Sequence, residues 1–388
     1  MTPDAAPIDP ALLPERVSAL PGVPSLREAV AASGASAYLV GGAVRDVLLG
    51  ARRADLDVVV EGDPLELASK LGGPQRAHDR FGTVTAVIDH ARVDLATARR
   101  ERYARPGALP EVEPAELPDD LSRRDFTVNA MAVPLHREAE LIDPHGGRDD
   151  LRAGVLRVLH DASFADDPTR ALRAARYAAR LGFALEPHTE QLLRAAGLAT
   201  VSEDRIEAEL LRLAAEPTAR RGFELLDEWG LIPLDPGAAE LIAEIIQLLA
   251  VDPWRSVAER ALVVYAAATG HGPGPVGRHR DLRDGARELV EAVPTRPSDA
   301  VRLASGRSDV ELALARAMSA QWLDDYVSSW RHLKLEISGE DLLAAGVAEG
   351  PAVGRGLAAA LRAKLDGEIS GREAELELAL AAAREADP

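Results

Sequence analysis

The 388-residue sequence contains no cysteine. Disulfides, thiolate metal sites and a cysteine nucleophile are therefore excluded, and a chain without cysteine suits a reducing compartment. The sequence also lacks any run of about 18 apolar residues, the length that a membrane-spanning helix needs, and its first residues show no basic segment followed by an apolar one. These absences predict an unprocessed cytoplasmic protein with no membrane partner.

An excess of positive charge is lacking as well. The chain has 45 Lys and Arg residues against 63 Asp and Glu, a formal net charge of −18. Because contacts with phosphates come from Lys and Arg, this balance excludes a nonspecific coat for nucleic acid. Nearly all of the cationic residues are Arg, concentrated between Arg148 and Arg221, so a local basic face is compatible with the sequence.

The order of apolar patterns predicts an α+β head followed by helices. Strand-like and helix-like segments alternate over the first 150 residues, whereas Ala-, Leu- and Arg-rich helical patterns fill the remainder. We expect a head with a mixed or antiparallel sheet flanked by helices, and then an all-α neck, body and tail. The expected boundaries are a Pro-rich leader at 1–25, the head at 26–149, the neck at 150–230, and the body and tail at 231–388. Within the head, residues 103–122 carry four prolines and no apolar period, which predicts a lid or a disordered loop.

Two aspartates stand at the start of a strand-like run of valines, in the segment DLDVVVE. Residues i and i+2 of a strand point to the same face, so Asp55 and Asp57 would lie side by side, about 6–7 Å apart by strand rise. Carboxylates at that distance repel one another unless a cation lies between them, and such hard oxygen ligands suit Mg²⁺ together with substrate phosphates. An isolated D-x-D is more often turn chemistry or solvated edge charge, so the neighbouring residues decide.

A glycine turn precedes this strand. The segment AYLV runs into Gly41 and Gly42 and then into a helix that carries Arg45. Glycines at a strand-to-helix turn allow backbone N–H groups to approach an anion at the helix N-terminus, and Arg45 can add a phosphate contact. The turn lacks the patterns of a dinucleotide fold and of a P-loop. A phosphate cradle followed by a carboxylate pair is typical of a nucleotidyl-transfer site.

Five motifs in order resemble those of one family. LVGGAVRD, DLDVVV, RRDFTVNAMA, LIDPHGGRDDL and ADDPTRALRAARYAARLGF are similar to the successive motifs of bacterial class II tRNA nucleotidyltransferases and their poly(A) polymerase relatives. The resemblance covers residues 36 to 230, more than half of the chain.

The resemblance implies a role for each matching residue. Asp55 and Asp57 would hold two Mg²⁺ ions that activate the RNA 3′-hydroxyl and grip the triphosphate, so that the hydroxyl attacks the α-phosphate in line and pyrophosphate leaves. Residues of the first and third motifs would bind the rest of the nucleotide: Gly42, Arg45 and Arg124 the phosphates, and Asp125 and Asn129 the ribose. Asp94, on a later strand, matches a third catalytic carboxylate of related folds; alternatively, it is a strand Asp paired with one of the following arginines.

The last motif bears on base selection, because the enzymes it resembles use no nucleic-acid template. Asp before Pro is the usual start of a helix, but Asp167 and Arg170 are three residues apart and can meet on one helix face. Together they would offer an acceptor beside a donor fork, which matches cytosine and adenine and mismatches uracil and guanine. Arg173 and Arg176 match nucleotide-contacting positions of the family, which has Glu where Asp166 stands.

The chain is therefore expected to be a template-independent nucleotidyltransferase that adds CCA to the tRNA 3′ end, with Mg²⁺ as cofactor and CTP and ATP as substrates. The resemblance implies that the body and tail hold the acceptor stem and elbow of tRNA; no obligatory protein partner is inferred. The main alternative is an enzyme that adds only A to a CC end. A CC-only enzyme is disfavoured, because in the resemblance such enzymes lack the loop present here at 103–122. A poly(A) polymerase and a non-catalytic RNA-binding relative are the remaining alternatives.

Overall fold

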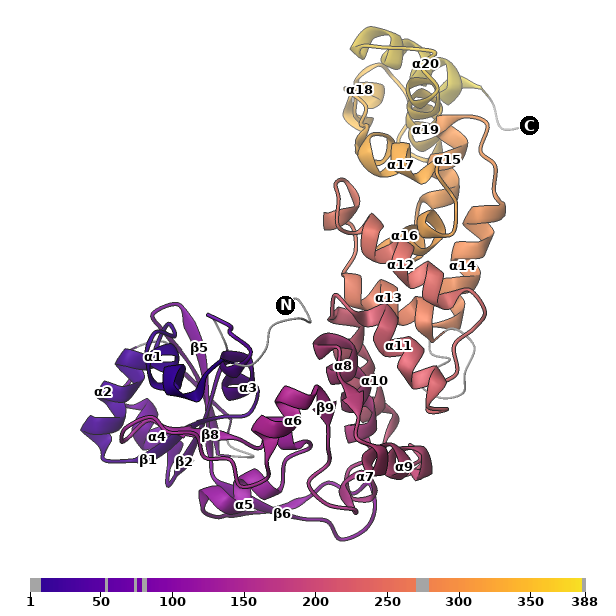
Figure 1. Ribbon diagram of the computed structural model, residues 1–388. Helices are drawn as coiled ribbons and strands as arrows, with labels where there is room; N and C mark the ends of the chain where they lie inside the picture. Colours follow the sequence, from indigo (N-terminus) through magenta and orange to yellow (C-terminus); the bar gives the residue numbers. More distant parts are fainter. Residues whose placement is uncertain (1–7, 53–54, 73–74, 79–81, 270–278, 386–388) are drawn as a thin grey trace. The chain divides into compact units, whose positions relative to one another are not determined.

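The computed structural model describes residues 8–385, except 53–54, 73–74, 79–81 and 270–278. The chain forms two units, Met1–Pro233 and Leu234–Pro388, each with a hydrophobic core of its own (Figure 1). No helix in the described part of the chain is long and apolar enough to cross a membrane.

Unit 1 begins with a mixed sheet flanked by helices (Figure 1). Within the described residues, six strands form it in the order β3-β4-β5-β2-β1-β8, and the neighbouring pairs are antiparallel except for β2 and β5, which run parallel. The strands are β1 (Ser36–Val40), β2 (Leu56–Glu61), β3 (Gln75–His78), β4 (Thr83–Ile88), β5 (Ala91–Thr97) and β8 (Ala132–Pro134). The helices are α1 (Leu13–Ser18), α2 (Val23–Ser33), α3 (Gly42–Leu48), α4 (Pro64–Ala68) and α5 (Leu117–Ser122). The predicted α+β head is confirmed.

Strand β2 lies inside the sheet, between β5 and β1. Its run of valines, 58–60, is buried, as expected for a central strand, whereas Asp57 is exposed. Because β2 and β5 are parallel with Asp57 opposite Asp94, the two carboxylates lie on the same face of the sheet. Asp55 precedes the strand directly.

The turn between β1 and α3 requires glycine. Gly41 has a φ of 66° and a ψ of −132°, a conformation that residues with a side chain rarely adopt. A Cβ on Gly41 would lie 2.7 Å from Nη1 of Arg124. The missing side chain therefore lets this guanidinium approach the turn.

The segment expected as a Pro-rich leader at 1–25 is largely part of the head. From residue 10 onward it contains η1 (Pro10–Leu12), α1 and the start of α2. Leu13, Val17 and Leu20 are at most 1% exposed, so they belong to the core. Pro14 does not prevent this, because it stands in the first turn of α1, where no backbone donor is needed.

Residues 103–122 are more regular than their prolines predict. β6 (Arg99–Arg102) and β7 (Glu111–Pro114) form an antiparallel hairpin, and α5 follows. The connection between the two strands is held in place, because the Gly107 N–H donates to the carbonyl oxygens of Ala165 and Asp166 and Arg205 donates to the Gly107 carbonyl at 3.0 Å. A disordered loop is therefore excluded. Hydrogen bonds of the backbone order this segment, and such bonds leave no apolar pattern in the sequence.

The rest of unit 1 is mainly helical. Its elements are η2 (Thr127–Asn129), α6 (Gly147–Ala153), α7 (Ser163–Asp166), α8 (Thr169–Leu181), α9 (Pro187–Ala195), α10 (Glu203–Ala215), α11 (Ala219–Glu228) and a short parallel pair, β9 (Val155–Leu156) with β10 (Ala184–Leu185). Helix α8 packs against α10 and α11. Its small buried residues Ala171, Ala174 and Ala175 allow this close packing.

Unit 2 is helical throughout its described residues. Its elements are α12 (Ala238–Leu248), η3 (Trp254–Ser256), α13 (Arg260–Ala268), α14 (Arg280–Glu291), α15 (Pro297–Ala304), α16 (Asp309–Ala317), α17 (Leu323–Ser328), η5 (Trp330–His332), α18 (Gly339–Ala344), α19 (Pro351–Leu365) and α20 (Arg372–Arg384). Leu342, Ala360 and Ala379 form part of a core shared by the last three helices. The predicted helical remainder is confirmed.

The start of α6 leaves no room for a side chain at Gly147, because an added Cβ would overlap the carbonyl oxygen of Thr127. We expect Gly147→Ala to lower the free energy of unfolding by about 1–3 kcal/mol, the usual cost of overpacking. Urea denaturation measures this. Gly197→Ala is the matched control, since nothing lies within 4 Å of its added Cβ. Equal losses in the two variants would contradict the packing argument.

Candidate functional site

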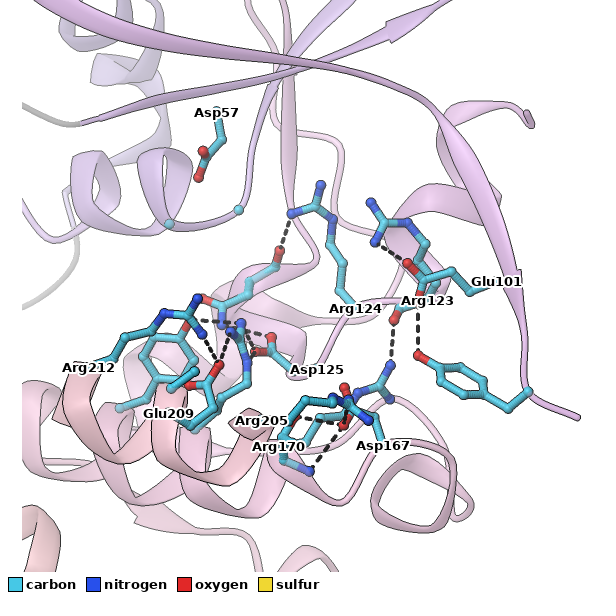
Figure 2. A pocket seen from close by; sticks show the side chains of 18 of the residues that line it. Asp57, Glu101, Arg123, Arg124, Asp125, Asp167, Arg170, Arg205, Glu209 and Arg212 are labelled. Atoms are coloured by element: carbon cyan, nitrogen blue, oxygen red, sulfur yellow. Dashed lines mark hydrogen bonds and ion pairs between the residues drawn. The ribbon is translucent and has the colours of Figure 1, made fainter. Parts of the chain in front are cut away.

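A polar cavity of about 520 Å³ lies between the sheet and the helices of unit 1. Cavities of this size hold small organic ligands. Its walls come from the Gly41 turn and β2, from the β6 hairpin, from the residues after α5, and from α8 and α10. Figure 2 shows Asp57 at one end of the cavity and Asp167 with Arg205 at the other.

The Asp57 end of the cavity gathers negative charge. Asp57 is exposed to solvent in the cavity, but the surrounding protein partly desolvates its carboxyl group. This desolvation raises the pKa of the Asp57 carboxyl. Arg124 lowers that pKa, while the negative charges of Asp94 and Asp55 raise it further. The structure thus brings the two predicted metal ligands and Asp94 into one electrostatic neighbourhood, although Asp57 is the one of the three that lines the cavity.

Asp94 has an arginine partner and lies beside Asp57, while its catalytic role stays a prediction. It stands opposite Asp57 in the sheet. Its carboxylate accepts hydrogen bonds from Thr85 Oγ1 at 2.6 Å and Arg92 Nε at 3.0 Å. The arginine partner precedes Asp94 in the chain, whereas one of the following arginines was expected.

Next to Asp57, the glycine turn and Arg124 form a wall with donors. Gly41, Gly42 and Arg124 line the cavity. Arg124 is held by Asp120, which accepts from its Nη2 at 2.8 Å. Asp120 is fully buried; desolvation alone would raise the pKa of its carboxyl, but Arg124 and Arg123 outweigh it and lower that pKa. The ionised Asp120 therefore positions the Arg124 guanidinium, as expected for a phosphate-binding group.

The structure gives Arg45 a different role from the predicted phosphate contact. The residue is 2% exposed and does not line the cavity. Its Nη1 donates to Asn129 Oδ1 at 2.6 Å, and its Nε and Nη2 donate to Asp46 Oδ1. Arg45 thus braces the glycine turn from behind.

Asp125 and Asn129, the predicted ribose-binding residues, line the cavity but are bound to one another and to the protein. Asn129 Nδ2 donates to Asp125 Oδ1 at 2.9 Å, and Arg173 donates to Asp125 Oδ2 through Nε at 2.8 Å. With the Arg45 bond, this makes a continuous chain of hydrogen bonds from α3 to α8, called here the Arg45–Arg173 network. Its members Arg45, Asp125 and Asn129 are buried, whereas the Arg173 side chain is 30% exposed.

Asp167 makes the capping contact at the start of α8, while its role in base recognition stays a prediction. Its Oδ1 accepts from the backbone N–H and the hydroxyl of Thr169, at the start of α8, and from Arg205 Nη2 at 2.8 Å. The other carboxylate oxygen of Asp167, Oδ2, accepts no hydrogen bond from the described residues, and Asp167 lines the cavity. One oxygen therefore caps the helix, and the other remains an acceptor for a ligand.

Arg170 lines the cavity as well, and its guanidinium is partly committed to the protein. Nη1 donates to Ser163 Oγ at 2.7 Å and Nη2 to the carbonyl oxygen of Arg123 at 2.7 Å. These bonds fix the orientation of the fork and leave Nε without a protein acceptor among the described residues. Asp167 and Arg170 thus lie in one wall of the cavity, as predicted.

The remaining two predicted arginines differ from one another. Arg173 lines the cavity, whereas Arg176 does not and faces Glu209 and Glu216. Both stack on the ring of Tyr177, with guanidinium carbons 5.5 and 4.7 Å from the ring centroid. Arg176 therefore supports α8 from behind the cavity.

Several cavity residues escaped the sequence analysis. They are Glu101, Tyr103, Arg123, Glu209 and Arg212. Glu101 accepts from Arg99, Arg123 and the Tyr103 hydroxyl and so ties the β6 hairpin to the segment after α5. The charged run RRERY was the available signal for Glu101 and Tyr103. For Glu209 and Arg212, the signal was their helical spacing from Arg205.

Two family models match the chain. The model described as "Poly A polymerase head domain" matches residues 37–157, and the one described as "Probable RNA and SrmB- binding site of polymerase A" matches residues 182–250. Both matches include cavity residues from the head or the neck.

Curated relatives extend the match over most of the chain. The CC-adding tRNA nucleotidyltransferase of Deinococcus radiodurans is 37% identical over 355 residues, which cover 87% of each chain. This chain belongs to the tRNA nucleotidyltransferase family. The A-adding tRNA nucleotidyltransferase of Halalkalibacterium halodurans is 43% identical over 204 residues. This family member spans about half or less of the length of the first three curated relatives it matches, at 48%, 20% and 44%.

Solved structures of tRNA nucleotidyltransferases have the same fold. A CCA-adding enzyme in its apo form II has a TM-score of 0.75 and 30% identity, with 96% of each chain covered. The CCA-adding enzyme of Thermotoga maritima in complex with tRNA_CCA has a TM-score of 0.68 and 29% identity, again with 96% of each chain covered.

The Arg45–Arg173 network predicts an acid-sensitive contribution to stability. Burial alone would raise the pKa of Asp125, but the charge of Arg173 and the hydrogen bond from Asn129 outweigh it and lower this pKa to about 2. A carboxyl whose pKa is depressed in the folded state stabilises the fold above its unfolded pKa and loses this as the pH falls through the folded one. The wild-type protein should therefore lose about 2 kcal/mol more than Asp125→Asn between about pH 4 and pH 2.

Urea denaturation over this pH range measures the difference. Asp149→Asn is the control, since its side chain is 86% exposed, and it should keep the wild-type pH dependence. The same pH dependence in wild type and Asp125→Asn would show that Asp125 is not held ionised.

Proposed function

We propose that the chain is a cytoplasmic, template-independent tRNA nucleotidyltransferase that adds C and A, from CTP and ATP, to the tRNA 3′ end to complete CCA. One observation carries this proposal: a single cavity has phosphate-type donors and Asp57 at one end and Asp167 with Arg170 at the other. A nucleotide placed along it would meet groups for its triphosphate and for its base at once. The tRNA_CCA complex of a structural neighbour supports RNA as the second substrate.

The carboxylates of the head fit a divalent cation. No group of three or more His, Asp or Glu side chains arranged for a metal exists in the part of the chain that the structure describes. Mg²⁺, however, is usually held by one or two carboxylates together with substrate phosphates, and the residues proposed for this are Asp55 and Asp57. Mg²⁺ bound there would lower the pKa of the RNA 3′-hydroxyl and neutralise charge on the triphosphate. Desolvation, followed by the charges of Asp94 and Asp55, raises the pKa of Asp57; this supports the proposal, because a bound cation would stabilise the ionised carboxylate.

The residues of the chain itself supply positioning and charge. We propose that the backbone N–H of Gly42 and the guanidinium of Arg124 bind the phosphates and stabilise the charge that accumulates on the leaving pyrophosphate. The N–H of Gly41 donates to the carbonyl oxygen of Met131. Asp125 and Arg173 would border the ribose. Because the Arg45–Arg173 network is already satisfied, these side chains need not reorganise when the nucleotide binds.

Base selection is proposed to use the free groups of Asp167 and Arg170. Oδ2 of Asp167 would accept from the exocyclic amino group of cytosine or adenine, and Nε of Arg170 would donate to the adjacent ring nitrogen. Uracil and guanine present a carbonyl and an N–H in those places. Each buried mismatch costs about 1–3 kcal/mol, or about 10- to 100-fold in selectivity.

RNA contacts outside the cavity are proposed for unit 2. Helix α19 carries Arg355, Arg362 and Lys364, but Lys364 is bound to the fully buried Glu375 at 2.5 Å. Arg362 is exposed and lines a groove together with Arg296 and Arg302. These three arginines are the better candidates for contacts with the tRNA backbone.

The second candidate function is the addition of A to tRNA that already ends in CC. It is favoured by the identity with A-adding relatives, although an A-adding and a CC-adding enzyme each match over most of the chain. The segment 103–122, which the β6/β7 hairpin orders in part, also speaks for A addition, because the resemblance implies that CC-only enzymes lack this loop. Base-reading groups that fit both C and A do not separate the two activities.

The decisive assay uses purified protein, Mg²⁺ and three tRNA transcripts, ending before CCA, after C and after CC. We expect CTP and ATP together to yield complete CCA on all three, and UTP and GTP to be used at least about 10-fold less well because of the mismatch described above. Sequencing of the products reads the outcome. Addition of A alone, and only to the CC end, would replace the first proposal by the second, and no addition to any transcript would refute both.

Removal of the metal-binding carboxylate should separate chemistry from binding. We expect Asp57→Asn, and likewise Asp55→Ala, to lower nucleotide addition about a thousandfold or more, because several kcal/mol of charge stabilisation are lost. Affinity for the tRNA transcript, measured by filter binding, should stay within about twofold of wild type. Retention of full activity in either variant would refute the assignment of that residue as a metal ligand.

A further inference from the structure

One face of α10 borders the cavity, and part of it has no role in the contacts proposed so far. Arg205, Ala208, Glu209 and Arg212 all line the cavity, at the spacing i, i+3, i+4 and i+7 of a single helix face. Arg205 pairs with Asp167 at the base-reading end. Arg212 lies two turns further on, about 10 Å along the axis by the helical rise, a separation comparable with the length of a nucleotide.

Arg212 is held by fewer residues than Arg124, Arg170 and Arg173. Each of those three donates to at least two different residues. The side chain of Arg212 is 60% exposed, and the partner that the structure gives it is Glu209, at 2.5 Å between Nη1 and Oε1. Its guanidinium can therefore turn to a ligand at a smaller cost in protein contacts than theirs.

Glu209 lies among three arginines but is within hydrogen-bond distance of only one of them, Arg212. It is 7% exposed. Its Oε1 bonds to Arg212 and is 3.8 Å from Arg173 Nη1, while its Oε2 is 3.9 Å from Arg176 Nη2. Oε2 of Glu209 and Nε of Arg176 are both buried, and neither has a hydrogen-bond partner within the part of the chain that the structure describes. A buried acceptor and a buried donor thus remain unpaired beside one another, which is an unfavourable arrangement that native proteins rarely keep.

We propose that Arg212 is a phosphate-binding residue, and that Glu209 exchanges Arg212 for Arg176 when a phosphate occupies the cavity. A guanidinium fork binds phosphate bidentately, as it binds a carboxylate, so a phosphate can compete with Glu209 for Arg212. Once Arg212 turns to it, a shift of about 1 Å brings Glu209 Oε2 within hydrogen-bond distance of Arg176 Nη2, which is now 3.9 Å away. The unpaired Oε2 then gains a donor, so the loss of one ion pair is offset by the strengthening of another.

The exchange connects two parts of the site. Arg176 belongs to α8, the helix that begins at Thr169, between Asp167 and Arg170 in the chain. A hydrogen bond between Arg176 and Glu209 would add to the existing packing of α8 against α10 when a phosphate is present. The base-reading residues would therefore be held most firmly in the loaded site.

The proposal rests on the proposed function, because that function supplies the phosphate. The triphosphate of CTP or ATP and the backbone of the RNA 3′ end share the required chemistry. Steady-state kinetics on the full-length protein distinguish them: KM for ATP at saturating CC-ended tRNA, and KM for that tRNA at saturating ATP, in wild type, Arg212→Ala and Arg212→Lys.

We expect Arg212→Ala to raise one of the two KM values about 10- to 100-fold, the usual effect of losing a charge-assisted hydrogen bond. kcat should change little, because the contact exists in both the ground state and the transition state. Arg212→Lys should recover part of the affinity, and the unfolding midpoint should stay at the wild-type value. A raised KM for ATP identifies the triphosphate as the ligand, and a raised KM for tRNA identifies the RNA backbone.

Arg152→Ala is the matched control, because Arg152 is also exposed and also pairs with an acid three residues away, on α6 outside the cavity. It should leave both KM values unchanged. Unchanged KM values in Arg212→Ala, or a loss of kcat together with a lower unfolding midpoint, would overturn the proposal in favour of a structural role.

If the wild-type protein adds no nucleotide, the proposed function fails but Arg212 can still be tested. Calorimetric titration of ATP, and of the CC-ended tRNA, into wild type and Arg212→Ala then replaces the kinetics. A 10- to 100-fold weaker Kd for either probe supports the phosphate contact. Equal Kd values for both probes overturn it.

Discussion

The Arg45–Arg173 network is the interaction on which the cavity depends. Asn129 donates a hydrogen bond to Asp125, and each of the two also accepts from an arginine, Asn129 from Arg45 and Asp125 from Arg173. Each charged side chain of the network therefore has a hydrogen-bond partner. An unpaired charge at this depth would be costly. Since the network runs from α3 to α8, the phosphate-binding turn and the base-reading helix are placed by the same set of hydrogen bonds.

Carboxylates with several arginine partners repeat this principle around the cavity. Asp120 orients Arg123 and Arg124, and Glu209 lies among the arginines of α8 and α10. Each buried acid keeps guanidinium groups in fixed directions while reducing their mutual repulsion. In a chain with a net charge of −18, this arrangement concentrates donors where an anionic substrate would lie. Asp57 differs from these buried acids: its neighbours include the carboxylates of Asp55 and Asp94, and no arginine among the described residues is hydrogen-bonded to it.

Much of the fold followed from the sequence, and the failures have a common cause. The β-branched run after Asp57 and the Ala- and Leu-rich helical patterns have strong periods, and the α+β head and helical remainder were predicted from them. Segments whose order comes from backbone pairing or from a few buried side chains carry no such period. The hairpin within 99–114 and the helices at 10–25 belong to this kind, and their prolines led to a wrong prediction of irregular structure.

The sequence by itself determined the chemistry of the site: a carboxylate pair at the head of a strand, a glycine turn before it, and Asp167 with Arg170 three residues apart on a helix. Tertiary structure decided what each group is free to do. Arg45 and Arg173 look alike in the sequence, yet one is buried behind the turn and the other borders the cavity. The reason is that hydrogen-bond partners such as Asn129 and Glu209 come from distant segments, and only packing brings those segments together.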